Sequence, residues 1–379
     1  MSARNIRTEP AGSRAVPGRD RAREGAGPAR RRSGGPPHRP GRPAGGRPAP
    51  APGTAATAGR PGAAVDRVVV GTVPLAARVA GGLLALAGLV GAIAPFLPYL
   101  VVGGRSLTEV SGPGTALVAL LVPAVALVMG AVLAAGRLPK LGMAYASVAA
   151  ALSAGPLLIE LYEGTRSTSR PATEFVTGVR VLTSTVTPRP GWVLGLVALG
   201  LTVLAGVVAA SAWGRTVMED GGSLDAARSS LAGAAVLLGV VTVLCLALPP
   251  AELPDEVVTD PATLVQSVVT QEGPRALLER PGLALLGGLL LAGAVVLCAV
   301  VSPSLRPRLA AVGGLLALAV AVLATALNGL RDALVSPDLV WTLPGIGLLL
   351  AGLGFTALAV LAWRLRRGLV PAPRPRGGI

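Results

Sequence analysis

The sequence predicts an all-α fold, a polytopic membrane bundle of about eight transmembrane helices arranged as four hairpins. Three observations carry this prediction. First, 52% of the 379 residues are hydrophobic and only 14% are charged, whereas soluble domains carry about 25% charged residues. Second, the charged residues cluster in the termini and in short connections. Third, the stretches between them approach the roughly 20 apolar residues that a helix needs to cross a bilayer.

Eight stretches of the chain contain no Asp, Glu, Lys, Arg or His. A charge at the centre of a membrane helix costs roughly 2.5 to 3.5 kcal/mol, so each uncharged stretch is expected to be one crossing. The predicted crossings are residues 79–101, 115–135, 141–159, 192–213, 229–250, 282–303, 309–328 and 344–363.

The N-terminal segment, residues 1–66, is rich in Arg, Pro, Gly and Ala and has almost no large apolar side chains. Such a segment cannot bury enough surface to offset its ordering entropy, so we expect a disordered cytoplasmic tail. Its long charged stretch precedes the first apolar one, which is not the order found in a signal peptide. We expect the transmembrane domain to cover residues 67–363 and a short basic cytoplasmic tail to cover residues 364–379.

Arginine and lysine predict the orientation of the helices. Basic residues gather at cytoplasmic helix ends, which places both termini in the cytoplasm and the protein in the plasma (inner) membrane. The high ratio of Arg to Lys is typical of a GC-rich bacterial genome. The basic residues close to the predicted inner ends are Arg67, Arg78, Arg137, Lys140, Arg215, Arg228, Arg306, Arg308, Arg364, Arg366 and Arg367.

Trp and Tyr favour the two membrane interfaces, and here they lie near the ends of the predicted helices. Trp192 and Trp213 flank the fourth stretch, and Trp341 and Trp363 flank the eighth. The three tyrosines, Tyr99, Tyr145 and Tyr162, also lie near helix ends.

Each even-numbered helix is preceded by a Pro-Gly dipeptide, which predicts an internal repeat of four hairpins. Proline fits the first turn of a helix, where its missing N–H has no partner to lose. The alternative is that Pro-Gly is a frequent turn in a chain with 51 Gly and 34 Pro. The four dipeptides are Pro113-Gly114, Pro190-Gly191, Pro281-Gly282 and Pro344-Gly345.

The two longest outer loops, about 160–190 and 251–281, are long enough to form small structures. In the second loop, Asp260 could cap a helix that begins at Pro261 and has apolar residues at helical spacing up to Val269. The alternative is a solvated loop.

The residue inventory argues against most membrane catalysis. The only histidine, His38, lies in the N-terminal tail, so a histidine triad or zinc site within the bundle is excluded. Carboxylate chemistry stays possible in the outer loop, but charge balance is the preferred interpretation. We therefore predict no catalytic, cofactor-binding or metal-binding residues and no cofactor. The outer carboxylates considered are Glu252, Asp255, Glu256, Asp260, Glu272 and Glu279.

The membrane stretches themselves contain only weakly polar groups. Thr and Ser there are expected to bond to their own helix or to a neighbour, and the prolines to be tolerated as kinks.

Cys245 and Cys298 are predicted at different depths, too far apart for a disulfide. Small residues four apart, as in Gly81 and Ala85 or Gly88 and Ala92, predict close helix packing and possible self-association.

These observations favour a non-enzymatic structural or accessory protein of the bacterial cell envelope. The alternative is a permease or flippase for an uncharged or lipid-like substrate, and an enzyme that uses loop carboxylates comes third. We expect the lipid bilayer as the main partner, with anionic lipid headgroups binding the basic tails and other membrane proteins as further partners. The net charge of +15 could also indicate nucleic acid, but the tail has no aromatic residues for base stacking, so we predict no nucleic-acid binding.

Overall fold

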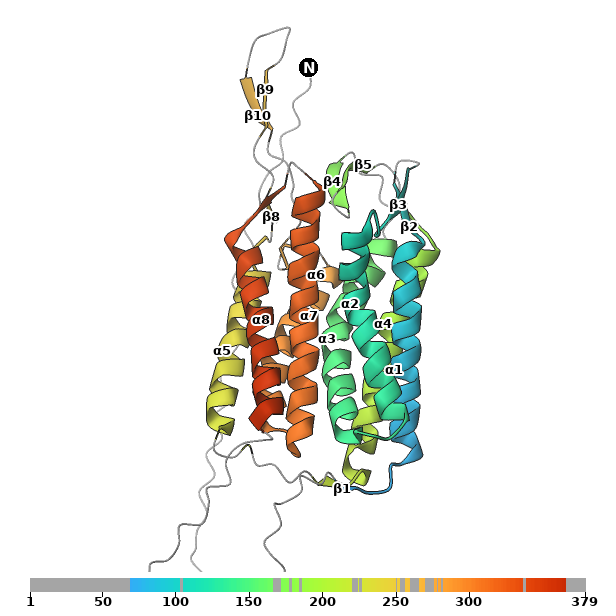
Figure 1. Cartoon of the computed structure of the whole chain (residues 1–379). Helices are drawn as coiled ribbons and strands as arrows, with labels where there is room; N and C mark the ends of the chain where they lie inside the picture. The colour runs from blue at the N-terminus through green and yellow to red at the C-terminus, as the bar shows by residue number, and fades with distance from the viewer. Residues whose placement is uncertain are drawn as a thin grey trace, which may run out of the picture. The chain divides into compact units, whose positions relative to one another are not determined.

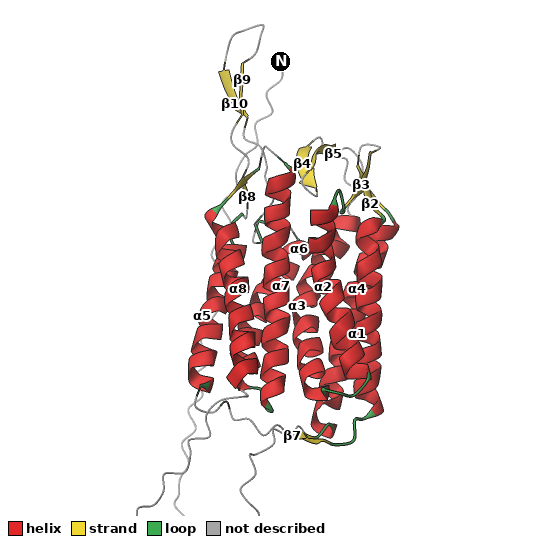
Figure 2. Ribbon diagram, viewed as in Figure 1, coloured by secondary structure: helices red, strands yellow, loops and turns green. Residues whose placement is uncertain are grey.

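The computed structural model describes a helical bundle with short strands at both of its ends (Figures 1 and 2). It describes residues 69–102, 105–165, 172–176, 179–183, 186–219, 224, 227–249, 251–252, 256–259, 266–269, 276–277, 279–280, 282–336 and 339–365. The predicted tail, residues 1–66, and most of the short C-terminal tail lie outside these ranges.

Eight helices within the described residues are long and apolar enough to cross a membrane, as an integral membrane protein of several crossings requires. They are α1 Leu75–Ile93, α2 Pro113–Ala134, α3 Pro139–Thr165, α4 Pro190–Ala212, α5 Arg228–Leu246, α6 Leu283–Val301, α7 Arg308–Val335 and α8 Leu343–Arg364. Three short 3-10 helices follow α1, α4 and α6: η1 Ala94–Phe96, η2 Trp213–Arg215 and η3 Ser302–Ser304.

The Pro-Gly dipeptides mark the starts of the even-numbered helices. Pro113 and Pro190 are the first residues of α2 and α4, and Pro344 is the second residue of α8. α6 begins directly after Gly282, whose φ of 61° is one that glycine adopts without strain. The predicted role of Pro-Gly as a helix entry is therefore confirmed for α2, α4 and α8, while Pro281 lies outside the described residues.

Three helices end six or more residues away from the predicted boundary: α1, α3, which continues past residue 159 to Thr165, and α7. The stretch 79–101 was expected to be helical throughout, but α1 ends at Ile93, and the chain continues as η1 and then as a strand. Pro95 and Pro98 explain the early end, because two prolines close together remove two backbone N–H donors and disfavour continuing the helix. In contrast, α7 extends past residue 328 to Val335 and includes the charged residues Arg331 and Asp332.

The helices α3 and α7 lie at the centre of the bundle. α3 contacts α4, α6 and α7, and α7 contacts α8, α3 and α2. In the apolar window of α7, 78% of the residues are buried, against 17% in the window of α4. The outer helices instead expose aliphatic side chains such as Leu237 on α5 and Val207 on α4, as a lipid environment demands.

Glycine allows neighbouring helices to approach closely, as the sequence predicted. A Cβ added at Gly81 of α1 would lie 2.4 Å from the backbone nitrogen of Ala134 on α2. A Cβ at Gly88 would lie 2.5 Å from the backbone nitrogen of Leu127. The α1 and α2 backbones are therefore in direct contact at these two positions.

Short antiparallel strands connect the helices at the two ends of the bundle. We call the end where α1 begins the basic end; β1 Val69–Val70 pairs there with β7 Met218–Glu219. At the opposite end, β2 Pro98–Val102 pairs with β3 Arg105–Thr108 and with β6 Val186–Pro188. There β8 Ala251–Glu252 also pairs with β11 Val340–Trp341.

The two long outer loops form hairpins of their own. β4 Ala172–Val176 pairs with β5 Val179–Thr183, and β9 Glu256–Thr259 pairs with β10 Gln266–Val269. The helix predicted from Pro261 to Val269 is therefore wrong at residues 266–269, while residues 260–265 lie outside the described ranges. The pairs Val257-Val258 and Val268-Val269 favour strands, because β-branched residues have high strand propensity.

Candidate functional site

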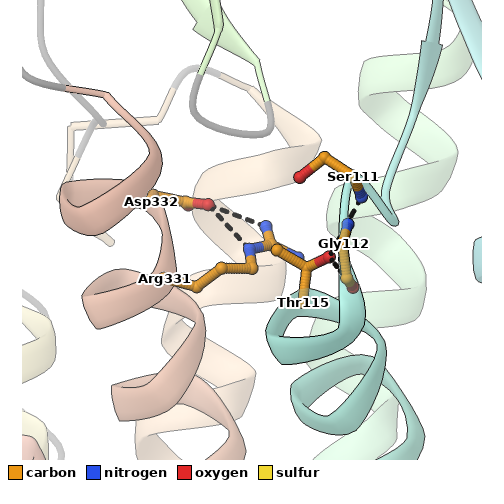
Figure 3. Close-up of polar contacts among 5 residues, drawn as sticks. All are labelled: Ser111, Gly112, Thr115, Arg331 and Asp332. Carbon is orange, nitrogen blue, oxygen red and sulfur yellow. Dashed lines mark hydrogen bonds and ion pairs between the residues drawn. The ribbon is translucent and has the colours of Figure 1, made fainter.

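A charged cluster lies at the opposite end of the bundle, where α7 ends beside the start of α2 (Figure 3). The Arg331 side chain is 10% exposed, and the Asp332 side chain is 27% exposed. Arg331 donates from Nε and Nη2 to Oδ1 of Asp332, at 3.0 and 2.7 Å. We call Glu109, Arg331 and Asp332 the rim triad.

The first turn of α2 forms the other side of this site (Figure 3). Thr115 Oγ1 accepts the N–H groups of Ser111 and Gly112 at 3.0 and 2.9 Å and donates to the Gly112 carbonyl at 2.8 Å. Thr115 thereby bonds two N–H groups directly before α2, which fixes where this helix starts. The sequence places Glu109 just before this turn.

Glu109 is the titratable member of the rim triad outside the helices. Burial raises the pKa of its carboxyl above the ordinary value of 4.5, the nearby Arg331 charge acts to lower it, and the Asp332 charge raises it further. Burial is the largest of these causes. Glu109 and Asp332 thus lie near one guanidinium, with Glu109 joined to α2 and Arg331 carried by α7.

A second polar cluster joins β2, α3 and α4 at the same end. The Tyr99 hydroxyl donates a short hydrogen bond to Oε2 of Glu160, and Trp192 Nε1 donates to the Glu160 backbone carbonyl at 3.2 Å. Glu160 directly follows the uncharged stretch 141–159. The aromatic residues that the sequence placed at an interface therefore also bond to a carboxyl-bearing residue of a central helix.

Lys140 makes a buried polar contact at the basic end. Its side chain begins in the first turn of α3 and is buried, with 7% exposed. Nζ donates to the Trp213 carbonyl at 2.6 Å and lies 4.2 Å from the centroid of the Trp213 ring. This cation–π contact and hydrogen bond connect the start of α3 with the end of α4.

Between the two ends, four threonine hydroxyls bond to their own helices as predicted, whereas the buried Ser147 hydroxyl has no hydrogen-bond partner among the described residues. Thr202, Thr242, Thr325 and Thr356 each donate to the carbonyl four residues earlier, at 2.7 to 3.0 Å. Both cysteines are free, as predicted. Pro123 and Pro156 lie inside continuous helices, which fits their interpretation as tolerated kinks.

The loop carboxylates considered in the sequence analysis are not brought together among the described residues. Oε2 of Glu279 accepts the N–H of Ala276 at 3.1 Å, which is a local turn contact. Glu252 and Glu256 lie on different two-stranded sheets, β8 with β11 and β9 with β10. Asp255, Asp260 and Glu272 lie outside the described residues.

The rim triad was not predicted from the sequence, because the seventh predicted crossing ended at Asn328 and left Arg331 and Asp332 outside the helix. No proline interrupts the segment from Asn328 to Val335, and this signal could have extended the helix to Arg331 and Asp332. The approach of Glu109 had no local signal, because more than two hundred residues separate it from Arg331.

The rim triad can form ionic contacts and can bind or release a proton at Glu109. No group of three or more His, Cys, Asp or Glu that could hold a metal ion occurs among the described residues. No protein-family model, curated protein or solved structure matches the chain. A functional proposal therefore rests on the chemistry and packing of the chain itself.

Proposed function

We propose that the chain is a non-enzymatic structural or accessory protein of the bacterial plasma membrane, with both termini in the cytoplasm. The distribution of charge supports this orientation. Lys140, Arg215, Arg228 and Arg308 begin or end helices at the basic end, and such residues favour the cytoplasmic side. The helices follow one another as four hairpins, each returning through a Pro-Gly entry.

The close packing of the central helices is the observation that carries the accessory role. A Cβ added at Gly313 of α7 would lie 2.2 Å from the Leu141 carbonyl oxygen of α3. A Cβ added at Gly155 of α3 would lie 2.4 Å from the Gly287 carbonyl oxygen of α6. Backbones in such contact favour a closed bundle over a substrate path, because a path would require these helices to separate.

The partners of an accessory protein then bind outside the helical core. The strand pair of β8 with β11 lies beyond the apolar helices at the opposite end, and other membrane proteins are the partners that we propose there. The basic tails provide charge for anionic lipid headgroups, at about 1 kcal/mol per Arg near the surface.

Site-specific photocrosslinking in intact cells tests this proposal. A photoreactive amino acid at Val340, a 58% exposed position of β11, is expected to yield a discrete protein adduct. The matched control is Leu237, a 66% exposed position on the lipid-facing side of α5, where we expect lipid and no discrete adduct. Adducts at neither position, or the same adduct at both, would contradict a partner at the opposite end.

Reconstitution tests whether the protein moves lipid, which an accessory protein is not expected to do. The purified protein in liposomes is expected to leave the flipping of a fluorescent phospholipid at the protein-free rate. Flipping that increases with protein content and is lost in Gly313→Leu would instead support the flippase alternative.

A further inference from the structure

The two halves of the bundle share one pattern of helix contacts. In the first half, α1 contacts α2 and α4, and α3 contacts the same two helices. In the second half, α5 contacts α6 and α8, and α7 contacts the same two. Between the halves, α3 contacts α7 and α6, while α7 contacts α3 and α2. Exchanging α1–α4 with α5–α8 preserves all of these contacts, as a two-fold axis between α3 and α7 would require.

The strand pairs of the two halves are also equivalent. β2 follows α1 and pairs with β6, which precedes α4. β8 follows α5 and pairs with β11, which precedes α8. Both pairings are antiparallel. The equivalent contacts differ in extent, since α1 packs more extensively against α2, α3 and α4 than α5 packs against α6, α7 and α8.

The pattern of buried and exposed residues along α1 also resembles the pattern along α5 when the two helices are aligned without a gap. Gly88 and Gly239 are both buried and occupy equivalent positions. Counted from these glycines, the exposed residues of the two helices coincide, and each buried residue falls opposite a buried or half-buried one. The buried pairs are Ala80 with Leu231 and Leu84 with Ala235, and the exposed pairs are Leu86 with Leu237, Leu89 with Val240 and Ile93 with Leu244.

The sequence from α2 to α3 aligns with that from α6 to α7 without a gap. The interval from Pro113 to Pro139 equals the interval from Pro281 to Pro307. Pro139-Lys140-Leu141 begins α3, and Pro307-Arg308-Leu309 begins α7. Lys140 and Arg308 are both buried, with 7% and 2% exposed.

The helices α4 and α8 share a longer motif. Leu199–Ala205 reads LGLTVLA, and Leu353–Ala359 reads LGFTALA, with five of seven residues identical. Thr202 and Thr356 occupy the same position in this motif, and both donate to the carbonyl four residues earlier, at 2.8 and 2.9 Å. The match therefore extends from sequence to side-chain bonding.

We infer that α1–α4 and α5–α8 are two copies of one four-helix unit, which meet through a dimer-type interface inside a single chain. In this arrangement, the α2–α3 face of each unit fits a second copy of the unit. The close contacts of Gly313 with Leu141 and of Gly155 with Gly287 belong to this interface. The rim triad also lies in it, because Glu109 is joined to α2 and Arg331 to α7.

This repeat is twice as long as the Pro-Gly hairpin, and it does not depend on the proposed function. Its symmetry predicts equal distances between equivalent positions. Leu86 on α1 corresponds to Leu237 on α5, and Val122 on α2 corresponds to Leu290 on α6; all four side chains are exposed. Labels at these positions therefore leave the core intact.

Double electron–electron resonance on the full chain in lipid nanodiscs tests the inference, with Cys245 and Cys298 replaced by alanine and spin-labelled cysteines introduced in pairs. Equal distances are expected for the pairs within a unit, Leu86 with Val122 and Leu237 with Leu290. Equal distances are also expected for the pairs across units, Leu86 with Leu290 and Leu237 with Val122. A mean difference above about 10 Å, one helix diameter, within either set would overturn the two-fold arrangement. Size-exclusion chromatography of each labelled variant confirms that a measured difference comes from a folded protein.

Discussion

Glu109 is a carboxyl group placed where its charge is disfavoured. Burial is the main reason that its pKa lies above the ordinary value, and the neighbouring Asp332 charge adds to this effect. Arg331 compensates in part, but it already bonds Asp332 through two nitrogens. The rim triad thus contains two carboxyl groups and one guanidinium, and folding shifts the protonation equilibrium of Glu109 toward the neutral form.

The raised pKa of Glu109 predicts a pH-dependent contribution to stability. The contribution of the protonated carboxyl is fully present below pH 4.5, the ordinary value, and is lost as the pH rises through the raised folded value. Glu109→Gln keeps this position neutral at every pH. We therefore expect the variant to gain thermal stability relative to the unsubstituted protein as the pH rises from about 4 to 8. Thermal unfolding in detergent measures this difference, and a constant offset or a loss with rising pH would contradict the assignment.

Lys140 shows why part of this chemistry could not be predicted from the sequence. Its place at a helix start and Trp213 at a helix end were both expected, since Lys and Trp favour membrane interfaces. Their mutual contact depends on the packing of α3 against α4, which no local pattern encodes. The sequence therefore indicated the interface residues but not their bonding.

At the scale of elements, the glycines of α1 distinguish a packed helix face from a lipid-facing one. Gly81 and Gly82 are adjacent in the sequence, so they differ little in intrinsic helix propensity. A Cβ at Gly81 would meet the α2 backbone, whereas a Cβ at Gly82 would have no atom within 4 Å. The pair therefore isolates the effect of packing.

Gly81→Ala is expected to destabilise the bundle by about 1 to 3 kcal/mol, because α1 and α2 must separate to admit the new methyl group. Gly82→Ala is expected to be neutral or slightly stabilising, since alanine favours the helix. Reversible unfolding in mixed detergent micelles measures both variants. Equal losses at the two positions would refute the close contact of α1 with α2.

The strands illustrate a second limit of prediction from sequence. Each crossing could be predicted because a charge in hydrocarbon is costly over a local window. In contrast, β2 pairs with β6 across more than eighty residues, and β8 pairs with β11 over a similar distance. Strand pairs of this kind follow from which helix ends lie together, so they require the fold to be known.

At the scale of the whole molecule, the charged residues that the structure describes lie at the two ends of the bundle and leave its middle uncharged. Basic residues lie where α3, α5 and α7 begin, the rim triad lies where α7 ends, and uncharged segments lie between. This pattern is typical of a protein that crosses a bilayer several times. We propose that the two ends face opposite sides of the membrane, with the basic end in the cytoplasm.

Cysteine accessibility in intact cells tests this claim most directly. In a background with Cys245 and Cys298 replaced by alanine, single cysteines replace Thr187, an exposed residue of β6, or Gly214 in η2, where added atoms meet open space. A membrane-impermeant maleimide is expected to label Thr187→Cys from outside and Gly214→Cys only after permeabilisation. Labelling of Gly214→Cys from outside, or equal labelling of both before permeabilisation, would contradict the account.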